Sequence, residues 1–167
     1  MQRWVDRHAD GAASIHKYRY GTVYSLADSF VTLVPSTYMN HSGFALREAI
    51  ENGLPLGRTL VIYDDKDLLL GTGRLSLDGG SGGHRGLQGI IDETGSEGFA
   101  RLRVGIGPFA RPLHEWVLGE WQAEEWSIIE GMDGPFADAL SLLAKGSPLS
   151  SLQSLVNAKE FWQGNRK

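Results

Sequence analysis

The apolar positions along the chain follow two periods, one typical of strands and the other typical of helices. Short apolar runs, or apolar residues alternating with polar ones, predict strands. The predicted strands cover residues 18–26, 30–34, 59–63, 72–77 and 101–106. The run at 59–63 does not alternate with polar residues, which is typical of strands buried inside a parallel sheet. The run at 101–106 places an arginine or glycine at every second position, which predicts one polar face.

Apolar residues spaced three or four apart predict helices. The predicted helices cover residues 1–13, 39–50, 87–94, 113–118, 122–132, 136–144 and 148–157. Asn52 and Gly53 follow the second of these, where a glycine commonly ends a helix. Strands interleaved with helices, with no repeat and no linker, predict one α/β domain over residues 1–167, with a frayed tail at 158–167.

Composition narrows the class of protein. The chain is 41% apolar and 22% charged, which is typical of a soluble globular protein, and it contains no cysteine for disulfides or thiolate chemistry. No apolar run approaches the roughly 18 residues of a membrane span. The net charge of −4 disfavours a general nucleic-acid coat, so a basic patch would have to be local. The arginines available for it are Arg74, Arg85, Arg101, Arg103 and Arg111.

Three carboxylates, those of Asp64, Asp65 and Asp67, follow the predicted strand at 59–63. Ligands of α/β sheets gather at the carboxyl ends of strands, where a carboxylate can orient a histidine, bind a metal or accept from a substrate. A run of this kind is also common in solvated turns. The chain offers no further spaced acids or histidines, so a metal site is not predicted.

The segment 78–87 is rich in glycine and ends in His84 and Arg85, just before the predicted helix at 87–94. Backbone N–H groups at such a place attract anions. The segment lacks both the Gly-Lys-Ser/Thr ending of a P-loop and the spacing of a dinucleotide-binding loop. A mobile lid over a polymeric or phosphate-bearing substrate therefore fits better than a nucleotide cradle.

Asn40 lies in the sequence Tyr38-Met39-Asn40, which opens the predicted helix at 39–50. It either caps that helix or points its amide into a cleft, where the amide can donate to and accept from a substrate peptide group. The chain has histidines at positions 8, 16, 41, 84 and 114 but no Gly-x-Ser-x-Gly nucleophile elbow. A Ser/His/Asp catalytic arrangement is therefore not predicted.

Taken together and in order, five segments resemble the bacterial-type peptidyl-tRNA hydrolase (aminoacyl-tRNA hydrolase) family, and the resemblance runs over roughly residues 1–157. The segments are residues 33–43, 60–68, 79–87, 99–108 and 117–119. The family implies a three-layer α/β/α fold around a mixed, mainly parallel sheet. It also implies a cytoplasmic, usually monomeric esterase that cleaves peptidyl-tRNA without metal or cofactor.

The resemblance also implies roles for individual residues. Asp64 matches the aspartate that orients the histidine base, and Asn40 matches the asparagine that holds the substrate peptide. His84 matches the lid histidine near the substrate, and Arg103 matches a basic residue that contacts tRNA phosphates. Tyr38 and Arg85 adjoin these positions and join the predicted substrate-binding or tRNA-binding residues.

The chain departs from the family pattern in three ways. It lacks the Gly-x-x-Asn-Pro-Gly and Thr-Arg-His-Asn motifs, so the first strand and the base histidine are expected to be missing and esterase activity to be low. Arg85 stands where the family has asparagine, and Ser76 stands where it has a basic residue, with Arg74 nearby. The alternatives are a catalytically inactive homologue that binds tRNA or a ribosome-linked partner, and a phosphate-binding α/β domain.

Overall fold

The computed structural model describes residues 12–26, 30–108, 112, 116 and 119–163. Its contacts divide the chain into two compact units. Unit 1 comprises Met1–Thr59 and Asp78–Phe99, and unit 2 comprises Leu60–Leu77 and Ala100–Lys167. Each unit combines strands with helices, which confirms the predicted α/β class. Of the described helices, none is long and apolar enough to cross a membrane.

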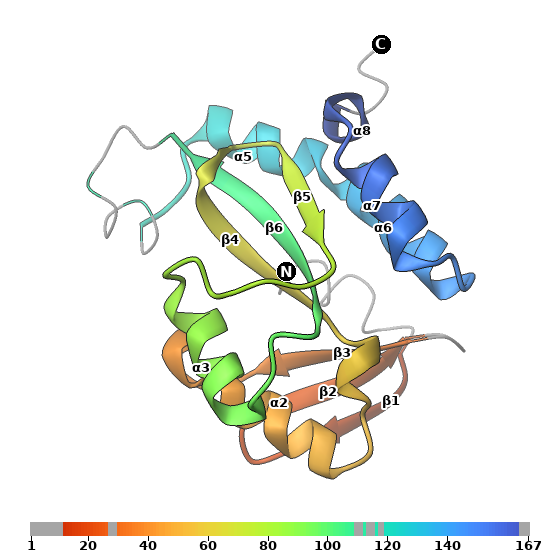
Figure 1. Ribbon diagram of the computed structural model, residues 1–167. Helices are drawn as coiled ribbons and strands as arrows, with labels where there is room; N and C mark the ends of the chain where they lie inside the picture. Colours follow the sequence, from red (N-terminus) through yellow and green to blue (C-terminus); the bar gives the residue numbers. More distant parts are fainter. Residues whose placement is uncertain (1–11, 27–29, 109–111, 113–115, 117–118, 164–167) are drawn as a thin grey trace. The chain divides into compact units, whose positions relative to one another are not determined.

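Unit 1 contains an antiparallel sheet of three strands in the order β1-β2-β3 (Figure 1). The strands are β1 (Ala12–Lys17), β2 (Gly21–Leu26) and β3 (Phe30–Pro35). The prediction for β3 is confirmed, whereas the predicted strand at 18–26 begins only at Gly21. Residues 12 and 13 of the predicted N-terminal helix belong to β1, in which Ala12 pairs with Leu26 of β2. The rest of that predicted helix lies outside the described residues.

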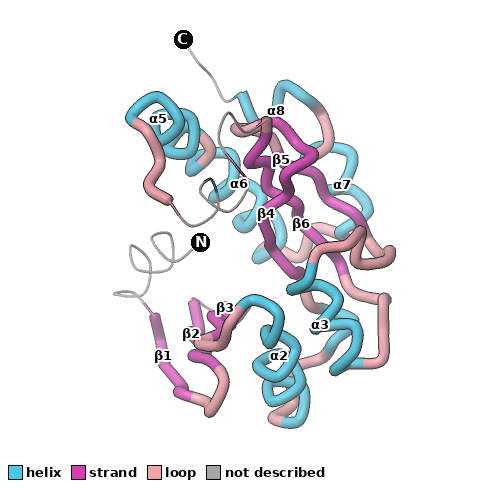
Figure 2. The backbone as a smooth tube through the Cα atoms, turned by 90° about the vertical axis from the view of Figure 1, so that its left-hand side faces the viewer, coloured by secondary structure: helices cyan, strands magenta, loops and turns pink. Residues whose placement is uncertain are grey.

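The helices of unit 1 confirm the predictions at 39–50 and 87–94. They comprise the short 3₁₀ turns η2 (Met39–His41) and η3 (Leu56–Arg58), and the helices α2 (Ser42–Glu51) and α3 (Arg85–Thr94). Helices α2 and α3 lie side by side (Figures 1 and 2). A Cβ atom on Gly43 would lie 2.1 Å from the carbonyl oxygen of Gly89, so glycine allows the two backbones to touch.

Unit 2 contains a second sheet of three strands, in the order β4-β6-β5. These are β4 (Leu60–Leu69), β5 (Gly73–Ser76) and β6 (Ala100–Gly107). Strand β4 runs parallel to β6 and β5 runs antiparallel to it. Strand β4 continues through the acidic residues 64–67, so the alternative of a solvated turn there is wrong.

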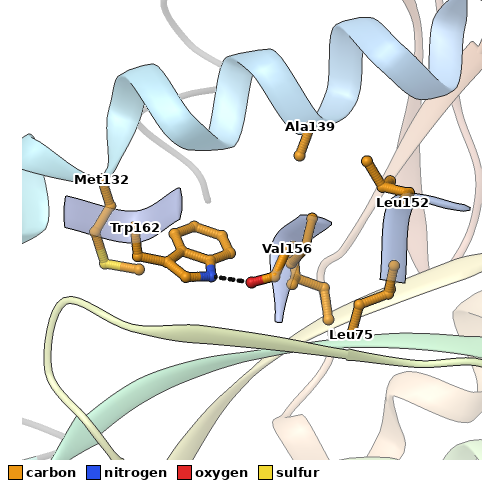
Figure 3. Close-up of a cluster of buried hydrophobic side chains, with 7 residues drawn as sticks. Leu75, Met132, Ala139, Leu152, Val156 and Trp162 are labelled. Atoms are coloured by element: carbon orange, nitrogen blue, oxygen red, sulfur yellow. Dashed lines mark hydrogen bonds between the residues drawn. The ribbon is translucent and has the colours of Figure 1, made fainter. Parts of the chain in front are cut away.

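The described part of unit 2 has four further helices, namely α5 (Ala123–Gly131), α6 (Asp133–Ala144), α7 (Leu149–Val156) and α8 (Lys159–Gln163). Side chains of α6, α7 and α8 form a core with Leu75 and Leu102 (Figure 3). Trp162 of α8 is 2% exposed, and its indole N–H donates to the Val156 carbonyl at 2.7 Å. The predicted frayed tail is therefore wrong for 159–163, because burying an indole holds this helix in place.

The predicted mainly parallel sheet is also wrong for the described strands. One pair is parallel (β4–β6), and three pairs are antiparallel (β1–β2, β2–β3 and β5–β6). For β1–β2 and β2–β3 the reason is connection length, since antiparallel neighbours need only a short turn whereas parallel neighbours need a crossover of about a dozen residues. The three-layer arrangement of the whole chain stays a prediction. Arg111, and the predicted helix at 113–118 apart from Trp116, lie outside the described residues.

Candidate functional site

In unit 1 the candidate site is built on η2 and the beginning of α3. Asn40 lies in η2, and a Cβ atom on Gly89 of α3 would lie 2.4 Å from the Asn40 carbonyl oxygen. The N-cap of α2 is His41, with no side-chain cap, so the alternative that Asn40 caps this helix is wrong. The Asn40 side chain is exposed and hydrogen-bonds to no described residue. Its carboxamide is therefore available to a ligand.

His84 caps α3. Its imidazole Nδ1 accepts a hydrogen bond from the Leu87 backbone N–H at 3.1 Å, and its own backbone N–H donates to Ser81 at 3.0 Å. A Cβ atom on Gly86 would lie 2.9 Å from the imidazole Cε1, so glycine at this position leaves room for the His84 ring to pack against the backbone. An imidazole that accepts at Nδ1 and is neutral carries its proton on Nε2. The Nε2 atom is buried in the structure, so the ring does not present it to solvent.

The glycine-rich segment before His84 folds back onto the first turn of α3. Gly79, Gly82 and Gly83 have φ values of 130°, 57° and 81°, which side-chain-bearing residues rarely adopt. The Ser81 hydroxyl donates to the Gln88 side chain at 2.7 Å. Arg85, the first residue of α3, is exposed at the positive end of the helix dipole, where a cation is disfavoured. An anion there would relieve this repulsion.

An open pocket of about 500 Å³ lies directly before Asn40 in the chain. It is lined by Ser36, Thr37, Tyr38 and His41, and the Tyr38 side chain is 83% exposed. Of these four, the sequence singled out only Tyr38 as a binding residue. The small hydroxyl side chains carry no spacing signal that would have identified them.

In unit 2 the candidate residues lie on β4 and β6, and the strand register separates them. Side chains alternate between the two faces of a sheet, and Asp64 is opposite Val104 whereas Tyr63 is opposite Arg103. Asp64 therefore shares the apolar face, which we define by Ile62, Leu75, Leu102 and Val104. The polar face carries Tyr63, Asp65, Arg74, Arg101 and Arg103.

Asp65 and Arg103 form an ion pair on the polar face. Arg103 Nε lies 2.5 Å from Asp65 Oδ2, and the side chains are 29% and 11% exposed. The hydrogen bond to Asp65 raises the pKa of the Arg103 guanidinium above its ordinary value. Burial raises the pKa of the neighbouring Tyr63 phenol, and the positive charge of Arg103 opposes that increase. The guanidinium is therefore a permanent cation on this face.

The remaining acid of the run, Asp67, pairs with its neighbour Lys66 at 2.7 Å, and both side chains are largely exposed. Within the described ranges, no group of three histidines, cysteines or acids is arranged to hold a metal ion. Unit 1 thus brings together Tyr38, Asn40, His84 and Arg85, and unit 2 contains Asp64 and Arg103.

The fold is that of a class of ester hydrolases. The crystal structure of peptidyl-tRNA hydrolase from Acinetobacter baumannii matches the chain with a TM-score of 0.79 and 26% sequence identity. The match covers 94% of this chain and 84% of that one.

Sequence comparison identifies the particular family. The family model "Peptidyl-tRNA hydrolase" matches residues 3–163. The peptidyl-tRNA hydrolase of Pelobacter propionicus is 40% identical over 137 residues, covering 78% of this chain and 68% of that protein. That of Geobacter sulfurreducens is 38% identical over 163 residues, covering 92% and 82%. The chain belongs to the peptidyl-tRNA hydrolase family, and by family it is a carboxylic ester hydrolase.

Proposed function

We propose that this chain hydrolyses the ester between a peptide and the 3′ ribose of tRNA, and so returns tRNA to translation. The match of the family model to residues 3–163 carries the proposal. The likeness to peptidyl-tRNA hydrolases of known structure supports it. As the resemblance implies, the proposed setting is the cytoplasm, and the protein acts as a monomer on peptidyl-tRNA without metal or cofactor.

Asn40 is the proposed contact for the substrate peptide. Its exposed carboxamide can donate to a carbonyl and accept from an N–H without adding charge. His84, whose Nδ1 caps α3, is the proposed lid residue near the substrate. Tyr38 and Arg85 complete this part of the site. The phenol ring of Tyr38 offers an exposed contact surface, and the charge of Arg85 favours phosphate.

Asp64 is the proposed partner of the catalytic base, and Arg103 is the proposed phosphate contact. Their positions on opposite faces of the β4-β6-β5 sheet fit separate roles, one in the chemistry and one in tRNA binding. In the reaction a base takes a proton from water, and the water oxygen bonds to the ester carbonyl carbon. The bond to the ribose oxygen then breaks, and that oxygen leaves as a hydroxyl after taking up a proton.

The sequence has no match to the family motif that contains the catalytic base, a histidine. No histidine here stands in a Thr-Arg-His-Asn motif, and the Nδ1 lone pair of His84 is used for capping. We therefore expect slow hydrolysis by the 167-residue chain. General-base catalysis contributes about 10²–10⁴-fold to a rate, which sets the size of the expected deficit.

The test measures hydrolysis of N-acetyl-aminoacyl-tRNA with the protein in excess. Slow, protein-dependent hydrolysis is expected, and Asn40→Ala should slow it further by on the order of tenfold or more. Asp64→Asn should have little more effect than Asp67→Asn, because the base that Asp64 would orient is not matched in this chain. Asp67→Asn is the matched control, because this acid pairs with an exposed lysine.

Rapid turnover would contradict the proposed deficit and direct the search for the base to His16 and His41. Binding of tRNA without any hydrolysis would favour the inactive tRNA-binding homologue. Absence of both hydrolysis and tRNA binding would refute the proposed function.

A further inference from the structure

The polar face of the β4-β6-β5 sheet concentrates positive charge. Arg74 of β5 lies directly opposite Arg103 of β6 in the antiparallel register. Like charges in directly opposed positions destabilise a pair of strands. Arg74 is exposed and Arg103 is 29% exposed, so both guanidinium groups remain open to an anionic ligand. The carboxylate that Asp65 contributes to this face compensates only one of these two charges.

Asp65 contacts Arg103 in a way that leaves part of the guanidinium available. The ion pair runs through Arg103 Nε, and no second hydrogen bond from Arg103 to a described residue is present. A guanidinium carries five N–H donors, and four of them are on the two Nη atoms. A pair of N–H donors on a guanidinium matches two oxygens of a phosphate. A carboxylate bound at Nε therefore orients the group without competing for the Nη atoms.

The backbone around Asp65 explains why this carboxylate is held firmly. The register between β4 and β6 shifts directly after Asp65, so the following residues of β4 turn over β6. A Cβ atom on Gly105, the register partner of Asp65, would lie 2.1 Å from the Leu69 carbonyl oxygen. The Asp67 backbone N–H donates to the other carboxylate oxygen, Asp65 Oδ1, at 2.8 Å, and Asp65 is only 11% exposed.

We propose that Asp65 is a positioning residue, which holds the Arg103 guanidinium with its Nη atoms outward to bind a phosphate of the tRNA backbone. The inference rests on the proposed tRNA-binding role of Arg103. It assigns a function to an acid that simple electrostatics would count as unfavourable for binding a polyanion.

That contrast makes the proposal testable. If only net charge mattered, replacing Asp65 by asparagine would remove a negative charge and strengthen tRNA binding. If Asp65 positions Arg103, the same replacement weakens binding, because the guanidinium loses its charged partner and must be ordered by the tRNA itself. The two accounts therefore predict changes of opposite sign.

The experiment measures the dissociation constant of the full chain for deacylated tRNA at two salt concentrations. Asp65→Asn is expected to weaken binding on the order of tenfold, about 1.4 kcal/mol. Asp67→Asn is the matched control, since it makes the same charge change at an exposed acid two positions along the strand. It should leave binding unchanged or slightly stronger. Arg103→Ala should weaken binding and reduce the salt dependence.

The double variant Asp65→Asn/Arg103→Ala isolates the coupling between the two residues. A positioning residue has no effect once its partner is gone, so this double variant should bind like Arg103→Ala alone. Thermal melting checks that each variant is folded. If Asp65→Asn does not fold, Arg103→Lys serves instead. It keeps the charge but lacks the guanidinium fork, and should weaken binding about as much as Asp65→Asn is expected to.

The outcomes separate the inference from the function on which it rests. Weaker binding by Arg103→Ala together with unchanged or tighter binding by Asp65→Asn would overturn the positioning role and leave the role of Arg103 intact. Wild-type affinity and salt dependence in Arg103→Ala would overturn the tRNA-binding role of Arg103, and the inference with it.

Discussion

Replacing Asn157 by alanine should destabilise the protein more than the removal of one surface side chain normally does. Asn157 follows α7 as its C-cap, and its carboxamide binds the edge strand β5. Its Oδ1 accepts from the Leu75 N–H at 2.7 Å, and its Nδ2 donates to the Leu75 carbonyl at 3.0 Å. The amide thus takes the place of a neighbouring strand at an otherwise open edge.

The expected cost follows from what each Leu75 group loses. Leu75 is 1% exposed, so water does not readily replace the lost partner of its N–H, and a buried donor without a partner costs about 1–3 kcal/mol. The Leu75 carbonyl keeps its hydrogen bond from Gln153 at 3.3 Å, so losing the bond from Asn157 costs only about 0.5–1.5 kcal/mol. Together these give about 1.5–4.5 kcal/mol, against a typical total of about 5–15 kcal/mol.

Urea unfolding followed by tryptophan fluorescence measures this loss, because Trp162 lies in the core next to Val156 (Figure 3). Asn52→Ala is the matched control. Asn52 is the C-cap of α2, and its Nδ2 donates to the Glu48 carbonyl at 2.8 Å at an exposed position. Water can replace that bond, so the control should cost under about 1 kcal/mol. Equal costs for the two variants would refute the argument that Asn157 satisfies a buried strand edge.

Two further outcomes are expected. Gly73→Ala should lower the melting temperature by several degrees, because its Cβ would lie 2.3 Å from the Trp162 ring. Gly57→Ala is the control and should leave the melting temperature unchanged, because its Cβ would meet nothing within 4 Å. A normal melting temperature for Gly73→Ala would contradict this packing. Burial raises the folded-state pKa of Tyr63, so its contribution to stability is present below the ordinary pKa of 10.0 and is lost as the pH rises through the folded value. Tyr63→Phe should therefore make the unfolding free energy fall less steeply above about pH 10, and an unchanged slope would argue against this linkage.

Local periodicity predicted the elements whose signals are contained in a short stretch of chain. The helices at 39–50 and 87–94 and the strand β3 are confirmed because their apolar spacing and end signals lie within the elements themselves. The strand β1 was not predicted, since Ala12–Lys17 forms a strand only by pairing with β2. The extension of β4 through its acidic residues was missed for the same reason, because pairing with β6 outweighs the turn preference of aspartate.

The candidate site shows the same division. Composition and the ordered motifs indicated Asn40, His84, Asp64 and Arg103 as residues of interest. The sequence could not show that His84 caps a helix, because imidazole is not among the usual N-cap side chains. Nor could it show that Asp65 rather than Asp64 pairs with Arg103, since strand pairing decides which face each of two adjacent acids takes.

The sequence by itself thus determined the family, the α/β class, the local helices and the chemical groups available for an ester hydrolase. Only the tertiary structure decided which groups meet. It pairs Asp65 rather than Asp64 with Arg103, and it binds Asn157 to an edge strand far away in the chain. The physical reason is strand register, because a shift of one residue exchanges the two faces of a strand, and register is set by contacts between segments distant in sequence.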